Sequence, residues 1–133
     1  MVYFISGHRD LTAEEFAEHY IPVLSKIIED DLFADFVVGD WEGCDKMALE
    51  FILSQPNYNF VSIYYANELK TRPMGSHPEN FEKVFTYEMP SYDVCDETMT
   101  NNSDFDVAWI RPGKEDSHTA NNIKRRYLNY VKH

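Results

Sequence analysis

Three short segments of the chain place glycine beside side chains that bind ligands or transfer protons. They are "SGHRDLT" (6–12), "GDWEGCD" (39–45) and "RPGKEDSHTANN" (111–122). Each segment leads toward a predicted helix, whose free N–H groups and dipole favour a phosphate or carboxylate at its N-terminus. Arg9, Arg111 and Lys114 add positive charge to these segments. This chemistry predicts a site for a small molecule that carries an anionic group.

The elements that must position these segments alternate between strand and helix. Short apolar and β-branched runs predict strands at 2–5, 35–40, 60–65 and 106–110, and "KVFTYEM" (83–89) is a candidate for a further strand. We therefore expect residues 1–133 to form a single α/β, Rossmann-like domain, with a mainly parallel sheet of about five strands and helices on both faces. In such sheets ligands bind beyond the carboxyl ends of the strands, where the strand order reverses. The three segments are expected to meet there.

The helices are predicted from capping residues and apolar spacing. Thr12 and Glu15 have the spacing of a capping box, and Pro22 is expected to kink the helix that follows. The apolar faces expected for the four helical regions are Ala13, Phe16, Ala17, Tyr20, Leu24, Ile27 and Ile28; Cys44, Met47, Ala48, Phe51 and Ile52; Val94, Cys95, Thr98 and Met99; and Ala120, Ile123, Tyr127 and Val131. Residues 66–80 contain several helix breakers and are expected to form a flexible flap.

Composition limits the classes of partner. The formal net charge of −11 argues against a nucleic-acid partner, because such binding requires an excess of basic side chains. Cys44 and Cys95 both lie in predicted helices, so we expect free thiols, a reducing compartment and a cytoplasmic protein without a membrane partner. No cofactor is predicted. The histidines lack the spacing of metal ligands, so no metal is expected.

The residues expected to bind the ligand come from all three segments. They are Ser6, Gly7, His8, Arg9, Gly39, Gly43, Asp45, Arg111, Gly113, Ser117 and Thr119. Each also has a structural explanation. The glycines can serve tight turns alone, Ser117 and Thr119 can cap the last helix, and Asp45 can stabilise its own helix dipole. Arg9 can form a surface ion pair, and Trp41 can either cover the core or stack on a flat ring.

The order and spacing of three segments resemble the SLOG superfamily, the Rossmann-like domains that include the LOG phosphoribohydrolases and the DprA and YpsA families. The segments are "ISGHRDLT", "GDWEGCDKMA" and "DETMTNNSDFDVAWIRPGKEDSHTANNI". Nucleoside deoxyribosyltransferases are more distant relatives. The resemblance implies a nucleotide, nucleoside or phosphoribosyl ligand, often bound by a homodimer. It also implies a reaction, which is cleavage of the N-glycosidic bond between a base and ribose 5-phosphate.

The last segment departs from the pattern of the LOG enzymes. Lys114 and His118 stand where that pattern has glycine, and Asn121 and Asn122 stand where it has a carboxylate. The arginine of the preceding helix also has no counterpart near Cys95. A positively charged transition state at the sugar needs a nearby negative charge, and the departing base needs a general acid.

The remaining carboxylates of the three segments are candidates for these catalytic roles. They are Glu42, Asp45, Glu115 and Asp116. The sequence favours ligand binding as the function. One alternative is an N-glycosidic hydrolase or transferase acting on nucleoside 5′-monophosphates. A second is a non-enzymatic interaction protein, because aromatic residues make up 15% of the chain.

Overall fold

A computed structural model describes residues 1–56, 58–68 and 82–132, and side chains as far as residue 128. The described strands are β1 (Val2–Ser6), β2 (Asp35–Val38), β3 (Val61–Ala66), β4 (Val84–Met89) and β5 (Phe105–Ala108). The described helices are α1 (Ala13–His19), α2 (Ile21–Asp30), α3 (Cys44–Leu53), α4 (Tyr92–Asn101) and α5 (His118–Lys132). The candidate strand at 83–89 is confirmed as β4.

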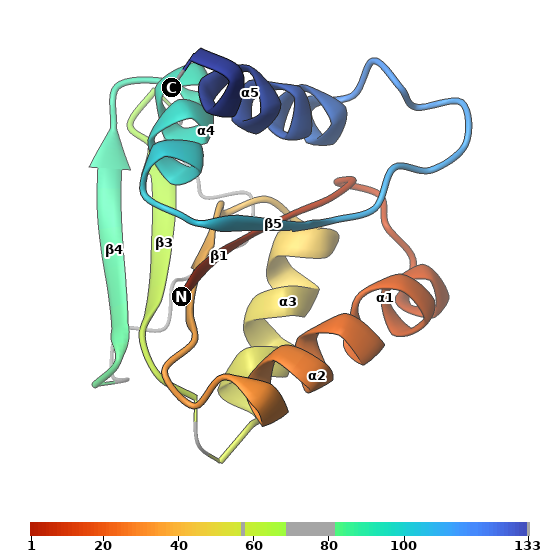
Figure 1. Cartoon of the computed structure of the whole chain (residues 1–133), viewed down its shortest axis with the longest axis vertical. Coiled ribbons are helices and arrows are strands. Elements are labelled where there is room, and N and C mark those ends of the chain that lie inside the picture. Colours follow the sequence, from red (N-terminus) through yellow and green to blue (C-terminus); the bar gives the residue numbers. More distant parts are fainter. Residues whose placement is uncertain (57, 69–81, 133) are drawn as a thin grey trace.

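The strands form one parallel sheet in the order β4-β3-β2-β1-β5. Ile5 of β1 pairs with Val38 of β2 on one side and with Val107 of β5 on the other. The chain therefore builds outward from β1 in one direction through β4 and then returns to the opposite side of β1 (Figure 1). This confirms the predicted α/β, Rossmann-like fold.

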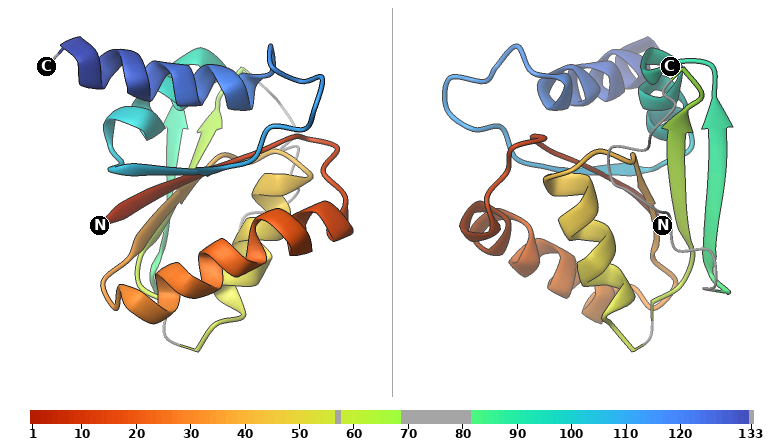
Figure 2. Two further views of the ribbon diagram at one scale, coloured as in Figure 1. Left: turned by 45° about the vertical axis from the view of Figure 1, so that its right-hand side comes forward. Right: turned by 180° about the vertical axis from the view of Figure 1, so that it is seen from behind.

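Helices cover both faces of the sheet. α1, α2 and α3 lie on one face, and α4 and α5 lie on the other (Figures 1 and 2). Successive residues of β1 serve different layers, because Phe4 packs in the core cluster with Cys95 and Met99 of α4, whereas Ile5 packs in the cluster beneath α1–α3. A strand buried on both faces reads as a continuous apolar run, and this explains the sequence of β1.

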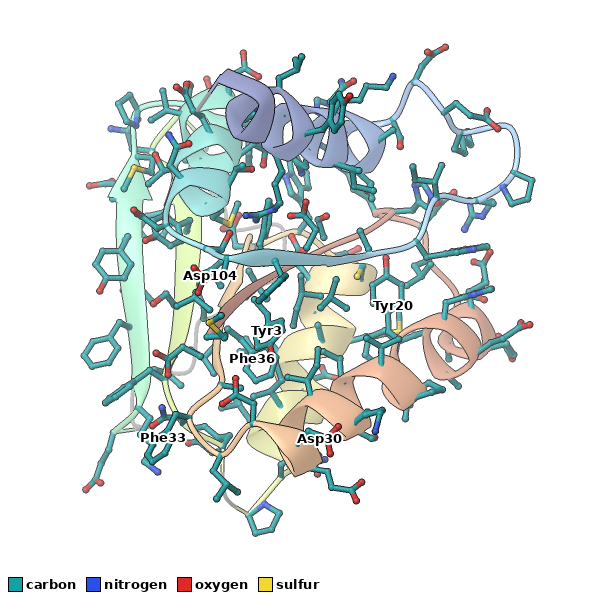
Figure 3. All side chains as sticks on the ribbon, in the orientation of Figure 1. Tyr3, Tyr20, Asp30, Phe33, Phe36 and Asp104 are labelled. Carbon is teal, nitrogen blue, oxygen red and sulfur yellow. The ribbon has the colours of Figure 1, made fainter. Side chains whose placement is uncertain are left out.

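The first helical region is broken into two helices. Thr12 caps α1 with the predicted capping box, because its side chain accepts from Glu15 N–H and Glu15 accepts from Thr12 N–H. The chain then turns at Tyr20, and Pro22 lies in the first turn of α2, where its missing N–H is tolerated. Tyr20 is fully buried between this junction and β5 (Figure 3). The prediction that Ala13 and Ala17 face the core is wrong, since both are exposed.

Two further predictions about helix faces are wrong. Val94 is exposed because α4 packs through Cys95, Met99 and Thr100. Tyr127 is 67% exposed, because the neighbouring Arg126 takes the inward position of that turn. Arg126 pairs with Asp106 at 2.8 Å and donates to Ser103 Oγ at 2.6 Å. The prediction for Val131, and the flap from residue 69 on, fall outside the described side chains and residues.

Both cysteines are buried free thiols, as predicted. Across the described part of the chain, no helix combines the length and the apolarity that crossing a membrane requires.

Candidate functional site

A cleft of about 520 Å³ lies where the strand order reverses around β1. Its walls come from the loop after β1, the segment after β2, one side of α4, and the segment that leads into α5. The two segments after β1 and β2 meet because parallel strands end at the same edge of the sheet. The third wall is formed because β5 returns to the side of β1.

Most of the residues expected to bind a ligand line this cleft. They are Ser6, Gly7, His8, Arg9, Gly39, Asp45, Gly113, Ser117 and Thr119. Gly43 and Arg111 do not line it. Among the candidate catalytic carboxylates, Asp45 and Asp116 line the cleft, whereas Glu42 and Glu115 lie outside it.

The end of β1 is built around a close contact at Gly7. A Cβ at this position would lie 2.5 Å from both Tyr20 Oη and Cys44 Sγ, so only glycine fits. The Tyr20 hydroxyl donates to the Ser6 carbonyl at 2.7 Å and accepts from Trp109 N–H at 2.9 Å. Burial raises the pKa of both Tyr20 and Cys44, so the two groups are neutral. Gly7 therefore serves packing at the cleft floor.

Ser6 lies at the floor of the cleft. Its side chain is buried, with 6% of the residue exposed, and its Oγ has no hydrogen-bond partner among the described residues. A buried hydroxyl without a partner is destabilising unless a ligand or water completes it. Ser6 Oγ is therefore an internal polar atom shielded from solvent, and a ligand can reach it only if neighbouring side chains move.

His8 holds two loops together. Its Nε2 accepts from Arg111 N–H at 2.8 Å, and its carbonyl accepts from Leu11 N–H and Cys44 N–H, each at 3.2 Å. Burial, followed by the charge of Arg111, lowers the pKa of His8. A neutral imidazole that accepts at Nε2 carries its proton on Nδ1. His8 thus positions the cleft wall.

Arg111 is held by two carboxylates, Glu15 outside the cleft and Asp10 at its rim. Its Nη2 lies 2.7 Å from Glu15 Oε1, and its Nη1 lies 3.0 Å from Asp10 Oδ1. The hydrogen bonds from Arg111 and then from Thr12 N–H lower the pKa of Glu15 to about 2. The expectation that Arg111 supplies charge to the ligand is therefore replaced by a structural role.

Gly43 also has a structural explanation. Its φ is +75°, and a Cβ there would collide with the carbonyl oxygen of Arg9. The residue allows the start of α3 to approach the loop after β1, where Cys44 N–H donates to His8.

Arg9, Trp41 and Tyr92 form a stack in the wall of the cleft. The Arg9 guanidinium carbon lies 3.4 Å from the centre of the Trp41 ring, which is cation–π geometry. The Trp41 and Tyr92 rings are 4.7 Å apart at 32°. Arg9 is itself exposed, so the cleft keeps a cation beside two aromatic rings.

Asp45 is a buried carboxyl group in the first turn of α3. Only 8% of the residue is exposed, and its Oδ2 accepts from Trp41 N–H at 3.1 Å. Gly39 permits this placement, since a Cβ there would lie 2.7 Å from Asp45 Oδ2. Burial, with Asp96 and Asp40 nearby, raises the pKa of Asp45 to about 7, although Trp41 N–H and Arg9 oppose the shift.

The N-terminus of α5 opens into the cleft. Ser117 caps the helix, because its Oγ accepts from Ala120 N–H at 3.2 Å, and this confirms the capping interpretation for that residue. Gly113 has a φ of +88°, which favours glycine, and the space at its Cβ position is open. Its N–H donates to Glu115 Oε1 at 3.2 Å. Asn122 is buried at the cleft, and its Oδ1 accepts from Arg125 Nη1 at 2.6 Å.

Several cleft residues were not expected from the sequence. They are Phe4, Asp10, Asp40, Tyr64, Tyr92, Cys95, Asp96, Met99, His118 and Asn122. Those of α4 carried a signal, since positions 92, 95, 96 and 99 share one helix face. Asp96 on that face is largely buried, and burial raises its pKa against the opposing charges of Arg125 and His118.

The cleft has more acidic than basic side chains. Aspartates at positions 10, 40, 45, 96 and 116 line it together with the cations Arg9 and Lys114. Within the described residues, no three His, Cys, Asp or Glu side chains are grouped so that they could hold a metal ion.

Comparisons of the chain with protein-family models, with curated proteins and with solved structures each returned no match.

Proposed function

We propose that the cleft binds a small molecule built on a nucleotide, a nucleoside or a phosphoribosyl group. The observation that carries this proposal is that the N-terminus of α5 and the exposed Arg9 side chain line the same cleft, at the reversal of strand order. The helix terminus and the Arg9 guanidinium offer donors to an anionic group. The resemblance of three segments to the SLOG superfamily agrees with this ligand class and stays a prediction.

The other walls fit the remaining parts of such a ligand. The exposed Arg9 guanidinium adds a charge that favours phosphate, and the aromatic side chains of Trp41 and Tyr92 offer apolar area to a base. The aspartates suit sugar hydroxyl groups, because ionised carboxylates accept hydrogen bonds. The acidic lining also disfavours a ligand with several phosphates.

A thermal-shift screen followed by calorimetry tests the proposal. Adenosine 5′-phosphate, adenosine and ribose 5-phosphate are the first probes, since a ligand that binds only the folded state raises the melting temperature. We expect Arg9→Ala to weaken a phosphate-bearing probe about tenfold, which corresponds to about 1.4 kcal/mol. Lys46→Ala, an exposed cation on α3, is the matched control. Equal affinity of Arg9→Ala and wild type, or no hit in the screen, contradicts the proposal.

Hydrolysis of an N-glycosidic bond is the second candidate function. It is favoured by Asp45, a cleft carboxyl group whose pKa of about 7 suits a general acid at neutral pH. Asp116 in the same cleft is a second carboxylate. Incubation with nucleoside 5′-monophosphates, followed by chromatography, tests this candidate. The candidate is supported if free base is released by wild type and not by Asp45→Asn. It is contradicted if the nucleotide binds to the protein but is still intact after incubation.

Self-association is proposed from a patch at the β4 edge of the sheet. Phe60, Phe85 and Tyr87 are each more than 40% exposed, and the rings of Phe60 and Phe85 lie 5.8 Å apart. Exposed aromatic patches mark contact surfaces. We expect light scattering to show a homodimer, and we expect Phe85→Ser to convert it to a monomer.

We also propose a cytoplasmic location, which the two free thiols support.

A further inference from the structure

Asp45 combines three features that ordinary first-turn aspartates lack. It is buried at the wall of the cleft, its Oδ2 already accepts from Trp41 N–H at 3.1 Å, and Gly39 leaves room for its carboxyl group against the backbone of the sheet edge. An aspartate whose only role was to stabilise its own helix dipole would contribute most stability in its ionised form. The surroundings of Asp45 oppose ionisation.

The charged groups that face Asp45 come from three elements. Asp40 follows β2, Asp96 comes from α4, and Arg9 comes from the loop after β1. The two aspartates disfavour a further negative charge, and Arg9 favours it. Burial has the largest effect on the pKa of Asp45 and disfavours the negative charge, so the net effect of the surroundings favours the neutral acid.

We propose that Asp45 meets the ligand as a protonated carboxyl group, which donates a hydrogen bond to an acceptor oxygen of the ligand. This inference rests on the proposed function and names the protonation state that its site requires. In the protonated form the carboxyl group gains one O–H donor, while its remaining acceptor capacity holds Trp41 N–H. In the ionised form it repels a phosphate or any other anion placed beside it.

The consequence is that ligand binding takes up a proton from solution. Because the pKa of Asp45 is about 7, near-neutral pH divides the protein between a binding form and a repelling form. The affinity for an anionic ligand must then fall as the pH rises through 7. Between pH 6 and pH 8 the expected loss is about tenfold.

Isothermal titration calorimetry with adenosine 5′-phosphate at pH 6 and pH 8 tests this inference. Asp45→Asn is the central variant, because asparagine keeps an acceptor for Trp41 N–H and carries a permanent N–H donor. The phosphate of the probe also titrates, so the ratio of the two proteins' affinities at each pH is the quantity compared. We expect wild type to lose about tenfold relative to Asp45→Asn between the two pH values. Glu42→Gln, an exposed carboxylate outside the cleft, should keep the wild-type pattern.

A second measurement separates this inference from the proposed function. Carbon-13 NMR of the side-chain carboxyl groups, assigned by their loss in Asp45→Asn, gives the pKa of Asp45 in the protein without ligand. Titration near 4 overturns the inference whatever the protein binds. Titration near 7 with no difference between wild type and Asp45→Asn in the pH dependence of binding overturns the ligand contact. Titration near 7 with no binding of any probe refutes the proposed function, and the ligand contact falls with it.

Discussion

The Nε2 atom of His8 accepts a hydrogen bond from the backbone N–H of Arg111 at 2.8 Å and joins two loops that are 103 residues apart in the sequence. One loop follows β1 and the other follows β5. The lowered pKa of His8 keeps the imidazole neutral, and only a neutral Nε2 can accept. The uncharged His8 side chain therefore helps to fix two walls of the cleft relative to each other, together with the ion pair between Arg111 and Asp10.

Replacing His8 with phenylalanine should destabilise the protein by about 1–2 kcal/mol at pH 7.5, because Arg111 N–H loses its acceptor. The pKa of His8 is below its ordinary value of 6.5 in the folded state, so the unfolded chain binds the proton more readily. The stability from His8 is thus complete above pH 6.5 and falls as the pH drops below it. Urea unfolding at pH 5 and 7.5 measures both effects.

Glu15→Gln should reduce stability at pH 7 and leave it unchanged near pH 2. The pKa of Glu15 falls from 4.5 to about 2 on folding, so its contribution exists above 4.5 and is lost as the pH falls from there to 2. The melting temperature from pH 2 to 7 provides the measurement. Glu14→Gln is the matched control, because it removes a carboxylate from the same helical turn. A gap between wild type and Glu15→Gln that persists at pH 2 contradicts the assignment.

Gly7→Ala should cost about 1–3 kcal/mol of stability, since the added methyl group would lie 2.5 Å from Tyr20 and Cys44. Gly113→Ala has open space and meets only the strain of its φ of +88°, so it should cost about 1 kcal/mol. Chemical denaturation of both variants gives the comparison. If Gly113→Ala lost more stability than Gly7→Ala, the side chains of Tyr20 and Cys44 must move aside to accept the methyl group at position 7.

Ser6→Ala should leave stability unchanged or raise it slightly, because the Oγ atom it removes is buried without a partner in the described structure. The same variant should bind adenosine 5′-phosphate as tightly as wild type, because Ser6 Oγ is shielded from solvent. Thermal unfolding and calorimetry test the two parts. Ser25→Ala, an exposed serine of α2, should change neither. A marked loss of stability in Ser6→Ala would point to an internal partner instead.

Asp45→Asn should stabilise the protein at pH 8 by up to about 4 kcal/mol. The pKa of Asp45 rises from 3.8 to about 7 on folding, so the folded state binds a proton more readily than the unfolded chain. Stability from this group is therefore present below 3.8 and falls as the pH rises to 7. Urea unfolding of wild type and variant at pH 4 and 8 should show a difference only at the higher value.

Much of the fold could be predicted because the central strands β1, β2 and β3 are largely buried and the helices bury one face. Phe4 and Ile5 are adjacent, yet they enter different core layers, and this requires an apolar run such as that of β1. The site was largely predictable for the same reason, since the loops after parallel strands meet at one edge. Ser6, Arg9, Asp45 and Thr119 come together in this way.

What the sequence did not show was which charges are already paired. Arg111 has the same residue type as Arg9 and a similar position after a strand, but it is bound by Glu15 and Asp10. That pairing depends on α1 lying beside the loop after β5, a contact that local spacing does not contain. The wall from α4 was missed because its helix face was assigned to the core alone. The face that buries Cys95 and Met99 also places Asp96 at the cleft.

The return of β5 to the side of β1 also determines when the cleft can form during synthesis. Chains emerge from the ribosome N-terminus first, so β1 to β4 are available before β5 and α5. A nascent chain that ends before residue 105 has β1 as an open edge and lacks the wall that Ser117 and Thr119 provide. Ligand binding would therefore require a nascent chain to extend through α5, and a product stalled before β5 would lack the site.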